Sequence, residues 1–287
     1  MKILVTGADG FLGKKLCTIL NKNEIIGTSR KDANLLHLDV TDDKNVASII
    51  EKIKPEIIVH AAALVNIEKC EIEKDLADSI NVRGTENIAR ACKQHKIKLI
   101  YISSDYVFSG KDSLYSLDSK KDPMNYYGLT KSLGEEVIKS TLSGFAIVRP
   151  TILYGFNDSE DKNSFVLKAI NKLKNNEQIM LDNKRTKYPL LIDDLARAID
   201  KIISSDMNGV FHLSGLDAVT KYDWGIKVAE IFNLPEEKII GQNMNEPYRP
   251  DNIKFNIQDN IIKVLNLEEG LKLIKIQMEK NGNNKKI

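Results

Sequence analysis

A glycine-rich turn follows the first apolar run of the chain and opens a helical pattern. Gly7, Gly10 and Gly13 come after the strand-like Ile3–Thr6, and the last of them lies within the amphipathic stretch Phe11–Lys22. In such a unit the first glycine allows a tight turn, the second lets the backbone approach a pyrophosphate, and the third lets helix and strand pack closely. The helix N-terminus then offers amide donors to a phosphate. This segment predicts a dinucleotide-binding unit, with a ligand-free turn as the alternative.

Strand-like and helix-like segments alternate through the first half of the chain. Further strands are expected at Glu24–Ser29, Glu56–Ala63, Lys98–Ser104 and Phe145–Leu153. Helices are expected at Asp43–Lys54, about 75–94 and Asn125–Thr141. Nearly continuous apolar strands are typical of a parallel sheet that is covered on both faces, and this element order places helices on both sides. We therefore predict an α/β protein with a Rossmann-type doubly wound parallel sheet.

The regular alternation of strand-like and helix-like segments changes after Gly155. The segment 156–163 reads as a loop, and the expected elements after it are 164–174 (helix), 178–181 (strand), 193–204 (helix), 210–214 (strand) and 220–232 (helix). The last fifty or so residues are expected to mix short elements with turns, and 281–287 to fray. The predicted domains are a nucleotide-binding domain, 1–155 plus about 189–214, and a smaller C-terminal domain, about 156–188 plus 215–287.

Charge and cysteine content exclude several classes of protein. The net charge is +2, from 42 basic and 40 acidic residues, so neither nucleic acid nor a membrane surface is suggested as a partner. Three widely spaced cysteines are typical of reduced thiols in a cytosolic protein. The four histidines lack metal-ligand spacing, so we predict no metal site and interpret them as structural. No signal-peptide layout and no apolar run of ~20 residues is present, so we expect a cytoplasmic location.

The end of the second expected strand bears on which cofactor binds. Arg30 and Lys31 follow Ser29, where an acidic residue would bind the ribose 2′-hydroxyl of NAD. Cations at this place favour a 2′-phosphate, hence NADPH. The aspartate that follows them weakens this preference, so NADH stays open. Asp39 and Val40, after the next short apolar run, are expected to flank the adenine.

Ser104, Tyr127 and Lys131 can together form a proton-donating site for a carbonyl. Helix residues four apart share a face, so a lysine can hold a tyrosine phenol and lower its pKa. A serine hydroxyl from another element can bind the substrate oxygen. Chance alone would supply such a tyrosine–lysine pair in a chain this rich in lysine. The pair gains meaning from its place on the helix after Asn125, with the serine at the end of the preceding strand.

Several segments match one enzyme family. Thr6–Gly13 matches its glycine turn, with Gly-x-x-Gly-x-x-Gly spacing, His60–Ala63 its small-residue stretch, and Asn81 its helix asparagine. The chain thus resembles the extended short-chain dehydrogenase/reductase family. The segments 101–110, 125–135 and 249–252 are similar to signatures of its dTDP-4-dehydrorhamnose reductases.

This resemblance implies that NADPH reduces a ketone while Tyr127 gives a proton to its oxygen. Lys131 would favour the phenolate and bind the nicotinamide ribose, Ser104 would orient the ketone, and Asn81 would hold a water. The smaller C-terminal domain would bind the substrate. Cofactor contacts are expected from Gly7, Asp9, Gly10, Phe11, Leu12, Gly13, Ser29, Arg30, Asp39, Val40, Ala61, Ala62, Ala63, Asn81, Tyr127, Lys131 and Pro150. Substrate contacts are expected from Ser104, Asp105, Tyr106, Tyr127, Ile152, Arg185, Lys187 and Arg249.

Departures from the family pattern leave the substrate open. Ile152 stands where these reductases usually have a tryptophan, and the segments 183–189, 211–215, 220–222 and 232–235 resemble the regulatory β subunit of methionine adenosyltransferase. The leading prediction is reduction of the 4-keto group of a nucleotide-linked 6-deoxysugar, with dTDP-4-dehydro-L-rhamnose, giving dTDP-L-rhamnose, as the best single candidate. The alternatives are another nucleotide 4-keto sugar, or a non-catalytic NADP-binding regulatory subunit.

A 4,6-dehydratase is disfavoured, because Tyr106 rather than glutamate follows Asp105. Magnesium is associated with some reductases of this group, although no carboxylate cluster in the sequence compels it. A homodimer stays open as well.

Overall fold

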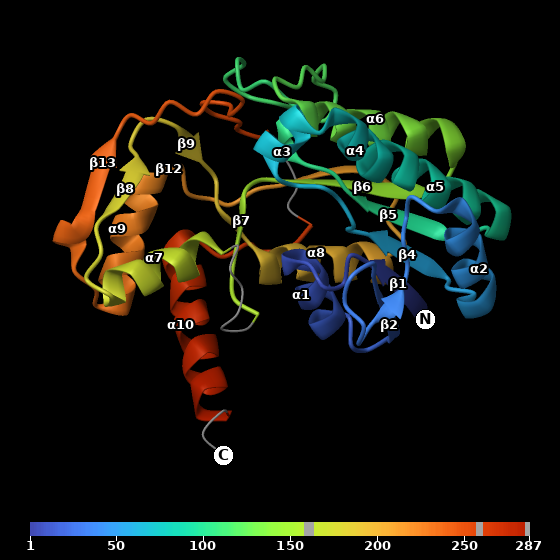
Figure 1. The fold of residues 1–287 in the computed structure, drawn as a ribbon, viewed down its shortest axis with the longest axis horizontal. Coiled ribbons are helices and arrows are strands. Elements are labelled where there is room, and N and C mark those ends of the chain that lie inside the picture. Colours follow the sequence, from blue (N-terminus) through green and yellow to red (C-terminus); the bar gives the residue numbers. More distant parts are fainter. Residues whose placement is uncertain (158–163, 257–260, 285–287) are drawn as a thin grey trace.

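A seven-stranded parallel sheet forms the centre of the molecule (Figure 1). The computed structural model describes residues 1–157, 164–256 and 261–284. Within them the sheet has the order β11-β6-β5-β4-β1-β2-β3. Its strands are β1 (Lys2–Thr6), β2 (Glu24–Ser29), β3 (Leu36–His37), β4 (Ile57–His60), β5 (Lys98–Ile102), β6 (Phe145–Pro150) and β11 (Gly209–Leu213). The strand order reverses direction at β1, which places a ligand crevice at the carboxyl ends of β1 and β4.

Helices cover both faces of this sheet. One face packs against α1 (Phe11–Ile19) and α8 (Ile192–Ser204), and the other against α2 (Asp43–Ile53), α5 (Gly84–His95) and α6 (Tyr126–Thr141). Successive residues of β1 show the two-sided burial, since Ile3 packs on the face covered by α1 and α8, and Leu4 on the face covered by α2, α5 and α6. The doubly wound α/β fold that the sequence predicts is confirmed.

A second apolar core lies beside the sheet, around the buried Trp224. It is built by α7 (Phe165–Lys174), β8 (Ile179–Asp182), α9 (Lys221–Phe232), β13 (Ile239–Gln242) and α10 (Leu267–Asn284). Three two-stranded sheets pair β8 with β13, β7 (Leu153–Tyr154) with β10 (Leu190–Leu191), and β9 (Thr186–Lys187) with β12 (Val219–Thr220). Strands β8 and β13 and helices α7 and α9 stand at the end of the molecule away from β2 and α2 (Figure 1).

The elements between β4 and β5 are more numerous than the sequence predicts. A short helix, α3 (Ile67–Ile72), was not expected. The predicted helix over 75–94 consists of α4 (Lys74–Ala77), a π-helical segment η1 (Asp78–Arg83) and α5. Two single 3₁₀ turns, η2 (Asp105–Val107) and η3 (Glu236–Lys238), complete the described elements.

The C-terminal expectation of short elements and turns holds for the described residues before 267 and is wrong beyond them. Residues 267–284 form one helix, α10, so the predicted fraying from 281 is wrong for 281–284, while 285–287 lie outside the described residues. Gly270 makes the segment a poor helix by propensity. Yet a Cβ there would lie 1.9 Å from the hydroxyl of Tyr154, so the packing requires glycine. Of the predicted loop over 156–163, residues 158–163 also lie outside the described residues.

Candidate active site

A cleft opens at the carboxyl ends of β1, β2 and β4. It is lined by Gly7, Asp9, Gly10, Arg30, Lys31, Leu38, Asp39, Val40, Thr41, Ala61, Ala62, Ala63, Leu64 and Ile80. Most of the residues expected to contact a dinucleotide therefore meet in one cleft. Sheets of this topology bind ligands at this edge, where the strand order reverses.

The glycine turn is shaped for close approach of a phosphate. Gly7 has φ +66°, and a Cβ there would meet the backbone of Ala62 at 2.9 Å. A Cβ on Gly13 would lie 2.1 Å from the carbonyl oxygen of Gly7. Helix α1 begins after Gly10, which has no side-chain cap hydrogen bond. The first amides of the helix are thus left for an anion, so this turn fits a dinucleotide pyrophosphate.

The rim of the cleft carries two exposed cations, Arg30 and Lys31. Ser29 holds the turn that presents them, because its Oγ accepts hydrogen bonds from the amides of Lys31 and Asp32 at 3.0 Å. The carboxylate of Asp32 is turned to Asn34, whose amide it accepts at 2.9 Å. The rim therefore suits an additional phosphate.

Asn81 ties the loop after β4 to helix α6. Its Oδ1 accepts from the amide of Leu64 at 2.7 Å, and its Nδ2 donates to the carbonyl of Leu64 at 3.0 Å and to Oγ1 of Thr130 at 2.9 Å. The π-helical turn η1 presents this side chain, and such turns often occur at functional sites. The water that Asn81 is expected to hold stays a prediction.

His60, at the end of β4, is a buried brace. Its Nδ1 lies 2.8 Å from Oγ1 of Thr6 and its Nε2 lies 3.2 Å from Oγ1 of Thr85. Burial lowers its pKa to about 3, and the nearby Lys131 adds to the effect. A neutral ring bonded on both sides agrees with the structural interpretation of the histidines.

Ser104 and Tyr127 meet at the end of β5. Ser104 caps η2: its Oγ accepts from the amide of Tyr106 at 3.2 Å and donates to Oδ1 of Asp105 at 3.0 Å. Tyr127 lies in the first turn of α6, which Asn125 caps by accepting from the amide of Gly128 at 2.6 Å. Burial raises the pKa of the Tyr127 phenol, against a lowering by its hydrogen bond with Ser104. The phenol therefore stays neutral, which is the form that can donate a proton.

Lys131 lies one turn further along α6 and is 2% exposed. Its Nζ stands 4.1 Å from the ring centre of Tyr101. Burial lowers its pKa to about 7, while the charge of Glu135 opposes the shift. The structure thus brings Ser104, Tyr127 and Lys131 to one place on α6 and β5, beside the glycine-turn cleft.

Polar side chains from the second half of the chain face the trio. Lys187 is buried and donates to the carbonyl of Pro250 at 2.8 Å, and its Nζ lies 6.0 Å from the ring centre of Tyr106. Burial lowers the pKa of Lys187 to about 8, while Asp105 opposes the shift. Burial also raises the pKa of Asp105 to about 6. A cation from the second half thus reaches the side chains that follow β5.

Arg249 also lies near the side chains that follow β5. It forms an ion pair with Glu68 of α3, with 2.5 Å between Nη2 and Oε1. Arg185 is placed differently, because its guanidinium is buried. It lies 3.2 Å from Asp182 and from Glu246 and donates to the carbonyl of Met244 at 2.6 Å. Of the two arginines expected at the substrate, Arg249 is the more accessible.

The two remaining predicted contacts lie at and beyond the end of β6. Pro150 is buried and pairs with Leu213 of β11. Ile152 is partly buried against the second core. No group of three or more His, Cys, Asp or Glu in the described part of the chain could hold a metal.

Sequence reasoning missed three acidic residues that support the site. Glu68 and Glu71 lie on the unpredicted helix α3; Glu71 accepts from the amide of Tyr126 at 2.6 Å and so caps α6 beside Asn125. Glu135 was noted only as part of a resemblance. The sequence could have indicated Glu135, because it stands four residues beyond Lys131 on the same helical face.

Within the described ranges no helix has the length and apolarity to span a membrane.

Comparisons with known proteins identify the family. Residues 1–253 match the family described as RmlD substrate binding domain. The chain is 30% identical over 247 residues to methionine adenosyltransferase 2 subunit beta of Xenopus laevis, covering 83% of this chain and 74% of that protein. It is 31% identical over 232 residues to the spore coat polysaccharide biosynthesis protein SpsK of Bacillus subtilis, covering 80% and 78%.

The fold agrees closely with a solved enzyme. A dTDP-4-dehydrorhamnose reductase from Bacillus anthracis, crystallised with NADP, superimposes with a TM-score of 0.88 at 29% identity, covering 97% of this chain and all of that one. The sheet, the glycine turn and the match over 253 residues lead to one assignment: the chain belongs to the RmlD substrate binding domain family.

Proposed function

We propose that this protein is an NADPH-dependent reductase of the 4-keto group of a nucleotide-linked 6-deoxysugar. The observation that carries the proposal is the meeting of Ser104, Tyr127 and Lys131 beside a cleft that fits a dinucleotide. The likeness to a dTDP-4-dehydrorhamnose reductase at a TM-score of 0.88 supports it. The substrate that this relative's name indicates, dTDP-4-dehydro-L-rhamnose, is the first candidate.

The side chains divide the work of a carbonyl reduction. A bound nicotinamide cofactor would supply the hydride. Tyr127 holds the proton that the substrate oxygen needs, at its phenol oxygen. Lys131, when charged, favours the phenolate that remains and so eases the transfer. Ser104 turns its hydroxyl from Asp105 towards the substrate oxygen and orients it.

The cleft and its mouth suggest how the two ligands are held. The amides at the start of α1 bind the pyrophosphate, Arg30 selects the 2′-phosphate of NADPH, and Asn81 keeps the floor of the cleft in place. Arg249 and Lys187 are the cations for the substrate diphosphate, since both reach Tyr106, close to Ser104, from the second half of the chain. We propose the domain boundaries on the same basis: 1–155 with about 189–214 bind the cofactor, and about 156–188 with 215–287 bind the sugar nucleotide.

The test is oxidation of NADPH with a panel of dTDP-, UDP- and GDP-linked 4-keto-6-deoxysugars. We expect turnover with at least one of them, fastest with dTDP-4-dehydro-L-rhamnose, and a lower KM for NADPH than for NADH. An absence of turnover with the whole panel, from protein that binds NADPH, would contradict the proposal.

A second candidate is a non-catalytic regulatory subunit. It rests on the 30% identity to methionine adenosyltransferase 2 subunit beta, which covers 83% of this chain. The placement of the trio does not decide between the two, because a regulatory protein can keep its cofactor site. Co-purification with a methionine adenosyltransferase catalytic subunit, together with no reduction of the sugar panel, would favour this candidate.

A further inference from the structure

One face of helix α6 carries a row of three functional groups. Tyr127, Lys131 and Glu135 stand four residues apart, so their side chains lie above one another. The last two are almost fully buried, with exposed fractions of 2% and 0%. The row therefore continues from the proton donor into the interior of the protein and ends on a carboxylate.

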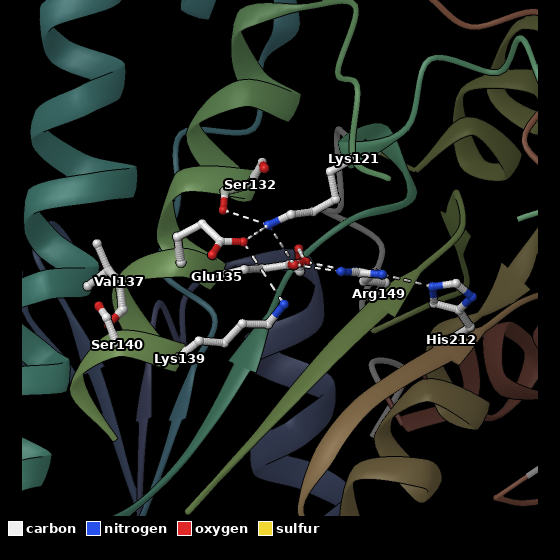
Figure 2. Close-up of polar contacts among 10 residues, drawn as sticks. Lys121, Ser132, Glu135, Val137, Lys139, Ser140, Arg149 and His212 are labelled. Atoms are coloured by element: carbon white, nitrogen blue, oxygen red, sulfur yellow. Dashed lines mark hydrogen bonds and ion pairs between the residues drawn. The ribbon is translucent and has the colours of Figure 1, made fainter. Parts of the chain in front are cut away.

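Glu135 is held from three sides. Arg149 of β6 donates to both carboxylate oxygens, from Nε at 2.8 Å and from Nη2 at 2.7 Å. Ser103, just after β5, donates to Oε1 at 2.6 Å, and Lys121, from the loop before α6, lies 3.2 Å from Oε2. Figure 2 shows this convergence, with His212 on the far side of the arginine.

These contacts keep Glu135 ionised. Burial alone would favour the neutral acid, but the hydrogen bonds and charge of Arg149, with Lys121 and Ser103, lower its pKa to about 2. Glu136, the other acid beside Lys121, is exposed and bonded to it at 2.6 Å. At any physiological pH the row on α6 therefore ends in a fixed negative charge.

Lys131 has few other charged neighbours. From β5 it meets the ring of Tyr101, and from β4 the neutral, buried His60. On the side of η1, the side-chain amide of Asn81 donates a hydrogen bond to Thr130, the residue before Lys131. The charge of Asp105 raises the pKa of the Tyr127 phenol instead. Among the described residues, Glu135 is the acid that favours the charged form of Lys131.

We infer that Glu135 is a positioning residue whose fixed charge keeps Lys131 protonated. The bidentate bond to Arg149 has a separate task, since it orients this carboxylate and ties α6 to β6. The inference rests on the proposed reductase function, in which a charged Lys131 assists Tyr127. It adds a third member to the row and explains why a buried lysine keeps a substantial charged fraction at neutral pH.

The direction of the effect follows from the charges. Burial lowers the pKa of Lys131 to about 7 with Glu135 in place. Without the carboxylate charge the pKa should fall further, by about one unit, because an opposite charge nearby favours the charged lysine. Lys131 would then be mostly neutral at pH 7. Reduction, which needs the charged lysine, would decline at a lower pH than in the unaltered protein.

Two matched substitutions separate charge from structure. Glu135→Gln and Arg149→Met break the same buried pair from opposite sides, so both cost stability. Only the first removes the negative charge near Lys131. We expect Glu135→Gln to lower the titration midpoint of Lys131 by about one pH unit, and Arg149→Met to leave it unchanged or raise it.

The measurement is NMR of protein carrying ¹³C-labelled lysine, with the Lys131 signal assigned by its loss in Lys131→Arg. It needs neither substrate nor cofactor, so it judges the inference even if no sugar is reduced. Equal shifts in the two variants, or no shift in Glu135→Gln, would overturn it. If Glu135→Gln does not fold, the double variant Glu135→Gln/Arg149→Met replaces it, and the same lowered midpoint is expected.

Kinetics give the second readout. Where the unaltered protein reduces a 4-keto sugar, the alkaline fall of kcat should begin about one pH unit earlier in Glu135→Gln and not in Arg149→Met. If the unaltered protein turns over no sugar, the proposed function fails, and the NMR titration alone decides the role of Glu135.

Discussion

At the scale of single residues, the proposed proton donor Tyr127 differs from the adjacent Tyr126 in what its phenol contacts. Tyr127 is hydrogen-bonded to Ser104, whereas the adjacent Tyr126 donates its hydroxyl hydrogen to Asp78 at 2.9 Å. The two phenols differ by one helix position, about 100° around the axis. Only the first faces the cleft side of the helix.

Tyr127→Phe should lower kcat for the reduced sugar by roughly 10²- to 10⁴-fold, because the proton donor is lost while the ring is kept. The thermal midpoint should change little. Tyr126→Phe is the matched control and should keep most of the activity. Steady-state rates with NADPH check both, and a fully active Tyr127→Phe enzyme would rule out the assigned role.

Cofactor choice is also decided by single side chains. Arg30→Ala should raise the KM for NADPH about tenfold or more, since a charge-assisted hydrogen bond to the 2′-phosphate is lost, and should leave the KM for NADH nearly unchanged. Paired titrations with the two cofactors make the measurement. Equal losses with both would place Arg30 outside the ribose site.

These residue-level features differ in how well a sequence predicts them. The glycine turn and the tyrosine–lysine spacing are local patterns, so they can be predicted without a structure. The pairing of Arg249 with Glu68 joins residues 181 positions apart, and the burial of Arg185 depends on Glu246. No local pattern carries that information, so both arginines looked alike as free cations.

At the scale of elements, the cap at the start of helix α6 lies directly beside the candidate catalytic residues. Asn125 accepts from the amide of Gly128 at 2.6 Å and donates to the carbonyl of Tyr248 at 2.8 Å. One side chain thus caps the helix that carries the trio and anchors the segment before Arg249. The cap was predictable from sequence, whereas its second bond required the fold.

Asn125→Ala should cost about 1 kcal/mol of unfolding free energy, as for other N-caps, and should also reduce kcat/KM several-fold because Tyr127 lies in the loosened turn. Ser164→Ala removes the cap of α7, in the second core, where Ser164 accepts from the amide of Leu167. It should cost similar stability and spare the activity. Urea unfolding and kinetics on both variants make the comparison.

Element prediction failed where packing overrides propensity. Helix α10 contains Gly270, which reads as a break in the sequence but fits against the hydroxyl of Tyr154. Its apolar face, Leu267, Leu271 and Ile274, is buried in the second core. Helix α3 is one and a half turns long, too short for a helical period to stand out.

At the scale of the whole molecule, two buried histidines make stability depend on pH. Burial lowers the pKa of His60 and of His212 to about 3. Below pH 6.5 these rings bind protons in the unfolded chain but not in the folded one, so their contribution to stability is complete above that pH and is lost as the pH drops towards 3. Glu135, with its pKa near 2, adds a further loss below about pH 4.5.

The unfolding free energy should therefore be lower at pH 5 than at pH 7 by on the order of 2 kcal/mol for each histidine. Urea titrations at the two pH values measure the difference. His212→Gln should remove about half of the histidine contribution. A pH-independent free energy over this range would contradict the buried neutral rings.

The path of the chain between β6 and β11 has a consequence for how such proteins can diversify. After β6 the chain builds α7 and β8 of the second core, then returns with α8 and β11 to complete the first sheet. Exchanging the second part, which consists of two separate segments of the chain, by recombination therefore needs three crossovers instead of one. A new substrate specificity should therefore evolve more readily by replacing individual loops and side chains than by transferring one contiguous segment of the chain.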